Sequence, residues 1–181
     1  ARPQLEWKLP AGWRETGPGQ MSLANFSIAG ATGQEAQVTI TPLPLMAGRE
    51  SMMVNMWREQ VGLEALSEAV TQKQFQTVEV GGEKGSLFEI SGKADASPPK
   101  RIVTAMVHRP DSSWFYKLSG DASLVEAQKP VFIEFLRSIQ IKDKPAPPPA
   151  AEAAPADETT KLKWQVPSGW QEVAPGPMQV A

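Results

Sequence analysis

The sequence contains no cysteine and a single histidine, His108. The absence of cysteine excludes disulfide bridges, thiolate metal sites and a cysteine nucleophile. A Ser-His-Asp site or a histidine metal site would have to be built around His108, and the G-x-S-x-G pattern of a nucleophile elbow is missing. His108 falls at the end of an expected strand, next to a turn, where we favour a structural role. We therefore expect that the protein is not an enzyme.

An excess of charge of one sign is also missing. The net charge is −2 at neutral pH, so neither nucleic acid nor an anionic membrane is expected as a partner. No apolar run reaches the roughly eighteen residues of a membrane span, and we expect no transmembrane segment in this chain. The glycine-rich residues 81–85 lack the spacing of a phosphate-binding loop and indicate a hairpin turn. We expect no cofactor.

Tryptophan and proline are abundant, with six and seventeen residues, and their positions reveal an internal repeat. Residues 5–24 recur, in register and without a gap, at residues 162–181. Both copies contain the pattern W-x-x-P-x-G-W, which is typical of a short strand closed by a Pro-x-Gly turn. We therefore predict a first domain over residues 1–142 and the start of a second, truncated copy over residues 161–181.

The segment between the copies, residues 143–160, is rich in proline and alanine. Its first part, residues 143–158, contains no β-branched or aromatic residue and cannot bury an apolar face. The prolines favour an extended, semi-stiff spacer. Since a strand and a turn do not make a domain, we expect the natural protein to extend beyond Ala181. The alternative is a tail that pairs with the edge of a sheet.

Periodicity predicts a mixed fold for the first domain. The expected strands are residues 5–9, 21–28, 36–43, 75–80, 84–90, 101–108 and 113–118, with hairpin turns at Gly81-Gly82 and Pro110-Asp111. The expected helices are residues 52–61, capped by Ser51 and stopped by Gly62, residues 64–71, and residues 124–138, capped by Asp121 or Ser123. Pro130 is expected to kink or restart the last helix. This order predicts an α+β fold, an α-β-α sandwich in which helices cover an antiparallel sheet of about six strands.

Four segments carry a resemblance to known proteins: residues 7–13, 55–63, 113–120 and 127–132. The chain resembles an uncharacterised family of bacterial envelope and lipoprotein domains with the PsbP/Mog-type/DcrB-like fold. The resemblance implies a non-enzymatic accessory or binding domain, exported to the periplasm or cell envelope. PsbP-like members are extrinsic subunits of photosynthetic complexes, Mog-type members bind a small GTPase, and DcrB-like members are periplasmic lipoproteins. Because these roles differ, the fold alone does not choose among them.

Two groups of residues are candidates for binding a partner. Asn55 and Arg58 lie near each other on the expected helix, and Arg58 and Gln60 could line a groove that recognises a carboxylate or a backbone segment. The alternative is that Asn55 and Arg58 tie the helix to a neighbouring loop. Trp114 and Tyr116 point to one face of their strand, where they form a binding surface if that face is open and core if helices cover it.

Met52 and Met56 share one face of the same helix. Thioethers can bind cuprous copper, but packing in a core or an interface is favoured.

The leading hypothesis is an exported, non-catalytic accessory or binding domain that engages a protein partner, as an extrinsic subunit of an envelope or membrane complex. The alternative is a small-molecule or metal-binding module that uses the Met/Asn/Arg helix. A pocket that groups His108 with a serine and a carboxylate would favour a third reading, a hydrolase.

Overall fold

The computed structural model describes residues 4–142. The predicted linker and second copy, residues 143–181, lie outside the described residues. The strands are β1 (Gln4–Glu6), β2 (Trp13–Glu15), β3 (Ala24–Ala29), β4 (Glu35–Pro44), β5 (Gln76–Val80), β6 (Glu83–Ser91), β7 (Lys100–His108), β8 (Ser112–Asp121) and β9 (Gln140–Lys142). The helices are α1 (Glu50–Gln60), α2 (Glu68–Gln74) and α3 (Ala122–Ser138).

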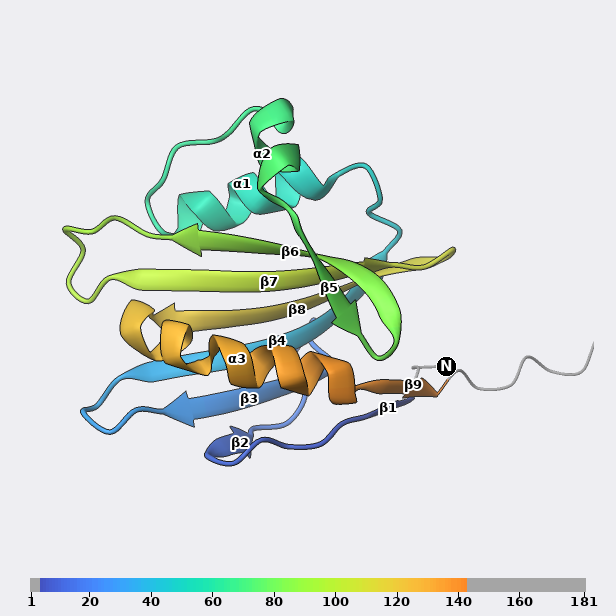
Figure 1. The fold of residues 1–181 in the computed structure, drawn as a ribbon, viewed down its shortest axis with the longest axis horizontal. Coiled ribbons are helices and arrows are strands. Elements are labelled where there is room, and N and C mark those ends of the chain that lie inside the picture. The colour runs from blue at the N-terminus through green and yellow to red at the C-terminus, as the bar shows by residue number, and fades with distance from the viewer. Residues whose placement is uncertain (1–3, 143–181) are drawn as a thin grey trace, which may run out of the picture. The chain divides into compact units, whose positions relative to one another are not determined.

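One antiparallel sheet forms the body of the domain. Its seven strands lie in the order β2-β3-β4-β8-β7-β6-β5, and β1 pairs with β9 in a separate two-stranded sheet. Helices α1 and α2 lie beside β6, whereas α3 lies across β8 and β4 (Figure 1). The predicted α+β class is confirmed, with the sheet packed against helices.

The sheet is wider than the expected six strands. The segment after the Pro-x-Gly turn forms a strand of its own, β2, because Trp13 pairs with Ile28 and buries its indole beside Phe26 and Phe135. The strand expected over residues 5–9 is shorter and pairs with β9 instead of the main sheet. The W-x-x-P-x-G-W segment therefore joins two sheets.

Alternation along the strands gives the sheet two apolar faces. One face packs against α3 and holds the larger cluster, which includes Phe26, Val38, Ile40, Tyr116, Leu118, Phe132 and Phe135. The other face packs against α1 and holds a smaller cluster, which includes Met53, Val54, Trp57, Phe88, Ile102, Met106 and Phe115. Both clusters are buried, so the sheet is the middle layer between α3 on one side and α1 on the other.

The predicted turn at Gly81-Gly82 is confirmed and also anchors α3. Val80 pairs with Glu83, so the two glycines form the whole connection between β5 and β6. The Gly81 N–H donates to the Leu136 carbonyl at 3.0 Å. A Cβ on Gly81, whose φ is +57°, would lie 2.3 Å from the Ile139 carbonyl oxygen. Only glycine allows this hairpin to approach the end of α3 so closely.

Two helix expectations are wrong in detail. Helix α1 begins at Glu50 with Arg49 in the cap position, so Ser51 is not the N-cap. Helix α2 begins at Glu68 and not at residue 64. Helix α3 is continuous through Pro130, so it does not restart there, and Asp121 occupies its cap position as predicted, without a side-chain cap bond. Helix α1 does end as predicted, since Gly62 takes a φ of +74° and its N–H donates to the Glu59 carbonyl.

No helix within residues 4–142 combines the length and the hydropathy that a membrane crossing requires.

Candidate functional site: the open sheet face beside α1

Helix α1 covers only part of its face of the sheet. The covered part lies over β6, β7 and β8 and is apolar. Over β3, β4 and the adjoining part of β8 the same face carries polar side chains, which we call the open sheet face: Asn25, Ser27, Gln37, Thr39, Lys117 and Ser119. The residues that alternate with them along each strand belong to the cluster under α3. The six polar side chains therefore point away from α3, beside α1.

A cavity of about 600 Å³ lies at one end of the open sheet face. Ser27, Gln37 and Ser119 of the open sheet face line it, together with Gln60 and Val61 at the end of α1. The other lining residues are Ile28, Ala29, Glu35, Ala36, Lys100, Arg101, Ile102 and Gly120. Its volume lies within the range of ligand pockets. Gln60 is thus the predicted binding residue that the structure places in a cavity.

Asn55 and Arg58 are engaged in holding a loop. The Asn55 side chain donates to the Leu66 carbonyl at 2.9 Å and accepts from the Leu66 N–H at 2.8 Å. Arg58 donates through Nε to the Glu64 carbonyl at 2.7 Å. These bonds match the alternative in which the two residues tie the helix to a neighbouring loop. They also explain why α2 starts late, because Asn55 holds the backbone of Leu66 outside the helix.

The aromatic pair of β8 lies in the core. Trp114 and Tyr116 are 2% and 0% exposed on the α3 face, and Phe115 is buried against Trp57 on the other face. Both faces are covered at this strand, so the core alternative of the sequence analysis applies. Burial raises the pKa of the Tyr116 phenol, with smaller opposing effects from Arg109, which lowers it, and Glu83, which raises it. Trp114 and Tyr116 are therefore not accessible to a partner.

Met52 and Met56 are exposed on the outer side of α1, at 56% and 44%. No group of three His, Asp or Glu side chains within residues 4–142 is arranged to hold a metal ion. The copper role of the two methionines therefore stays a prediction that depends on their thioethers alone.

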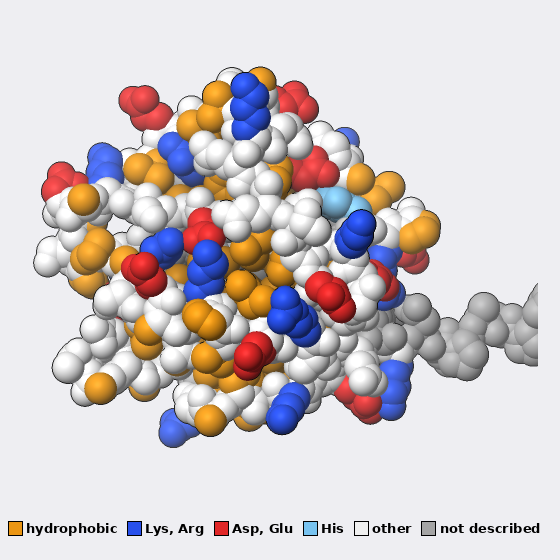
Figure 2. All heavy atoms as spheres, viewed as in Figure 1, with side chains coloured by type: hydrophobic (Ala, Val, Ile, Leu, Met, Phe, Trp, Pro, Cys, Tyr) orange, Lys and Arg blue, Asp and Glu red, His pale blue; other side chains and the backbone are white. Residues whose placement is uncertain are grey.

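A second cavity, of about 620 Å³, lies between β5, β6 and α3. Lys84, Lys129 and Arg137 line it together with Glu79. Lys129 pairs with Glu89, and Arg101 donates to the other Glu89 oxygen at 2.8 Å. Burial raises the pKa of Glu89, but the bonds and charges of Lys129 and Arg101 outweigh it and hold the pKa below its ordinary 4.5. Charges of both signs are interspersed on the visible side of the molecule, which carries α3 (Figure 2).

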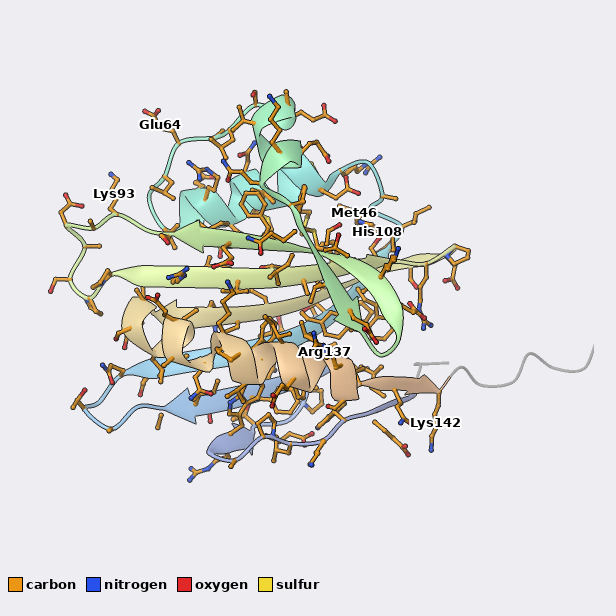
Figure 3. The ribbon with its side chains drawn as sticks, viewed as in Figure 1. Met46, Glu64, Lys93, His108, Arg137 and Lys142 are labelled. Atoms are coloured by element: carbon orange, nitrogen blue, oxygen red, sulfur yellow. The ribbon has the colours of Figure 1, made fainter. Side chains whose placement is uncertain are left out.

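His108 lies between a serine and a carboxylate. Its Nδ1 is 2.7 Å from Ser113 Oγ, and its Nε2 is 3.0 Å from Glu50 Oε1, without the alignment of a hydrogen bond. The Met46 N–H donates to Ser113 Oγ at 2.7 Å, and Met46 and His108 lie close together in Figure 3. A proton on Nε2 fits the contact with Ser113, since Ser113 can then donate to Nδ1, while the Nε2 N–H faces Glu50 without a hydrogen bond.

This trio has the composition that would favour a hydrolase, but its serine does not open to solvent. Ser113 is 0% exposed, and it lines neither of the two cavities. Attack on a carbonyl requires the reacting atoms to approach within about 3–3.5 Å, and the burial of Ser113 leaves no room for a substrate there. In this arrangement the trio fastens the loop before α1 to the β7–β8 hairpin.

The sequence analysis named none of the six residues of the open sheet face, and Lys117 is the one among them that carries a charge. Thr39 of β4 and Thr104 of β7 are its register partners, one on either side. Within residues 4–142 the side chain of this lysine makes no hydrogen bond or ion pair. Burial lowers the pKa of Lys117, and no neighbouring carboxylate offsets that effect. The Thr104 hydroxyl is also buried and has no partner among the described residues.

No protein-family model and no curated protein matches the chain. Among solved structures, the chain is similar to a protein of Bacteroides thetaiotaomicron VPI-5482, with 9% identity and a TM-score of 0.45 over 77% of this chain and 46% of that protein. It thus spans about half the length of that protein. It is also similar to LpqN, which is involved in cell envelope biogenesis of Mycobacterium tuberculosis, with 10% identity and a TM-score of 0.46 over 78% of this chain and 85% of LpqN. Both likenesses are too distant to transfer a role to this chain.

Proposed function

We propose that the domain is an exported, non-catalytic binding domain that engages a protein partner through the open sheet face. The single observation that carries this proposal is the partial cover of the sheet. Helix α1 shields the apolar half of its face, whereas the polar half stays open beside a cavity of about 600 Å³. The opposite face of the sheet is apolar and covered by α3, so the open sheet face is the part of the sheet that a partner can reach.

The role as an accessory subunit of an envelope or membrane complex rests on the sequence. The four segments that resemble envelope and lipoprotein domains support export. The repeat of residues 5–24 supports a tandem protein, in which linked modules raise the effective concentration of each binding site for its neighbour's partner. Fractionation of the source cells tests the location, and recovery of the protein in the cytosol alone would contradict export.

The non-catalytic part of the proposal is supported by the burial of Ser113. A serine nucleophile acts on a substrate that reaches its hydroxyl, and this hydroxyl is enclosed and already accepts the Met46 N–H.

Site-directed photo-cross-linking tests the binding surface. A photoreactive amino acid is placed at Ser27 or Gln37, which are exposed on the open sheet face, or at Glu134, which is exposed on α3 as a matched control. The full-length protein is expressed in its source cells and irradiated. We expect the same cross-linked protein from the Ser27 and Gln37 positions and not from Glu134. Equal cross-linking from all three positions, or from Glu134 alone, would contradict the proposal.

The exposure of Met52 and Met56 favours a second candidate, a metal-binding module. The two thioethers are one helical turn apart and reach solvent, while Asn55 and Arg58 are occupied by the loop. Cuprous copper titration of the protein and of a Met52→Ala, Met56→Ala double variant tests this candidate. An unchanged stoichiometry would exclude these residues as ligands.

A further inference from the structure

Lys117 occupies the inner end of the open sheet face. Register places it in one cross-strand row with Asn25 and Thr39 on one side and Thr104 on the other. The next row along the same face contains Ser27, Gln37 and Ser119, which line the cavity. Side chains two residues apart on one strand point to the same face. The lysine therefore lies one row further along the sheet than the lining of the cavity.

The charge of Lys117 is uncompensated. Within residues 4–142 it makes no ion pair, although other cations near this end of the sheet do, such as Lys100 with Asp121 at 2.7 Å. The Lys117 side chain is half-buried, so its ammonium has lost part of its hydration. An anion or hydrogen-bond acceptors beside the ammonium would offset that loss. Glu35 lines the opposite end of the cavity and makes no ion pair with Lys117. The open sheet face thus carries a cation without its anion.

The Thr104 hydroxyl gives a second, independent indication. Thr104 is 1% exposed, and its Oγ1 has no hydrogen-bond partner among the described residues. An unpaired buried hydroxyl costs about 1–3 kcal/mol in typical proteins. This donor lies on the same face as Lys117, in the adjacent register position. A group with two acceptor oxygens and a negative charge would satisfy both residues together, and a carboxylate is such a group.

We propose that Lys117, Thr39 and Thr104 form a subsite for the carboxylate of an aspartate or glutamate side chain of the partner. The ammonium supplies the opposite charge. The Thr104 hydroxyl is enclosed but, unlike that of Ser113, has no partner among the described residues, and it donates to the second carboxylate oxygen once the side chains that enclose it move aside. A side chain suits the site better than the main chain of the partner, because Lys117 and Thr39 are half-buried and Thr104 is buried, one row along the sheet from the cavity that would hold the segment. This inference rests on the proposed function and names the chemistry that it recognises.

Nuclear magnetic resonance of the isotope-labelled protein tests the subsite with three short peptides. The first is acetylated, amidated and carries one internal glutamate; the second carries glutamine in its place; the third carries glutamine and a free terminal carboxylate. We expect saturable shifts of the Lys117 and Thr104 signals with the glutamate peptide alone. Equal shifts with the glutamine peptide, shifts with the free terminal carboxylate alone, or no saturable shift would overturn the proposal.

Variants separate the subsite from the rest of the surface. Lys117→Met removes a half-buried charge, so the variant is expected to fold, and Thr104→Val removes only the hydroxyl. We expect Lys117→Met to weaken glutamate-peptide binding at least about tenfold, and Thr104→Val to weaken it by a smaller factor. The matched control Lys84→Met, which removes an exposed lysine on β6, should leave binding unchanged. Unchanged binding in Lys117→Met would overturn the subsite.

The cross-link from Gln37 tells the two proposals apart. If the subsite is wrong but the binding surface is right, the cross-link persists with equal yield in Lys117→Met and the peptides give no specific shift. If the binding surface itself is wrong, the Gln37 position gives no specific cross-link in either protein.

Discussion

Ser113→Ala should destabilise the domain, because the Ser113 hydroxyl joins two segments that are distant in the sequence. It accepts the Met46 N–H at 2.7 Å and bonds His108 Nδ1 at 2.7 Å, and the residue is 0% exposed. The substitution leaves one backbone donor and one imidazole nitrogen without a partner. Each orphaned group costs about 1–3 kcal/mol, and partial exposure of His108 reduces its share, so the expected loss is about 2–4 kcal/mol.

Urea denaturation of the full-length protein, followed by far-ultraviolet circular dichroism, measures this loss. Ser123→Ala is the control, since Ser123 is exposed and its hydroxyl accepts a bond from Gln34 alone among the described residues; it should change the free energy of unfolding by less than about 0.5 kcal/mol. The reasoning is refuted if Ser113→Ala costs no more than Ser123→Ala.

Three further predictions concern other buried groups. Tyr116→Phe removes a buried hydroxyl that has no partner among the described residues, so the free energy of unfolding should stay constant or rise by about 1 kcal/mol; a loss above about 1 kcal/mol, measured in urea, would reveal a bond to that hydroxyl. The pKa of Glu89 is lower in the folded protein than its ordinary 4.5, so the stabilisation by Lys129 and Arg101 is fully present above pH 4.5 and is lost as the pH falls through the lower folded value. Glu89→Gln should therefore lower stability at pH 7 and flatten the decline between pH 5 and pH 3, and an unchanged acid slope would contradict this cause. Hydrolysis of a chromogenic acetyl ester should proceed at the same slow rate in the natural protein and in Ser113→Ala; a rate that depends on Ser113 would contradict the non-catalytic reading.

Much of the fold could be predicted because it follows from local patterns. The Gly81-Gly82 turn confirms the hairpin, since two residues with positive φ are what such a short connection needs. The apolar spacing of residues 124–138 predicts α3 and its buried face, and Gly62 predicts the end of α1. These signals involve residues close in the sequence, so no knowledge of the tertiary fold is required.

The errors come from interactions between distant residues. Ser51 is a good cap by residue type, but α1 starts two residues earlier than expected, at Glu50, which meets His108. Pro130 is tolerated because it and Glu126 are both exposed, so water can reach the carbonyl that the missing N–H leaves free. Neither the contact with His108 nor the exposure of α3 is visible in the local sequence.

The candidate site was only partly predictable for the same reason. The polar residues of the expected helix predict Gln60 as a binding residue, and Gln60 does line a cavity. Lys117 was missed because alternation shows to which face a side chain points but not how much of that face a helix covers. Helix α1 covers Phe115, which is therefore part of the core. Lys117 lies two residues further along the same strand, and its side chain has no partner among the described residues.

The most direct test of the binding surface compares two bulky substitutions once the cross-linked partner is purified. Gln37→Trp fills the open sheet face beside the cavity, and Glu134→Trp adds the same bulk to the exposed side of α3. Isothermal titration calorimetry with the partner should show at least about tenfold weaker binding for Gln37→Trp and unchanged binding for Glu134→Trp. Unchanged binding by Gln37→Trp, or a loss confined to Glu134→Trp, would contradict the proposal that the partner binds the open sheet face.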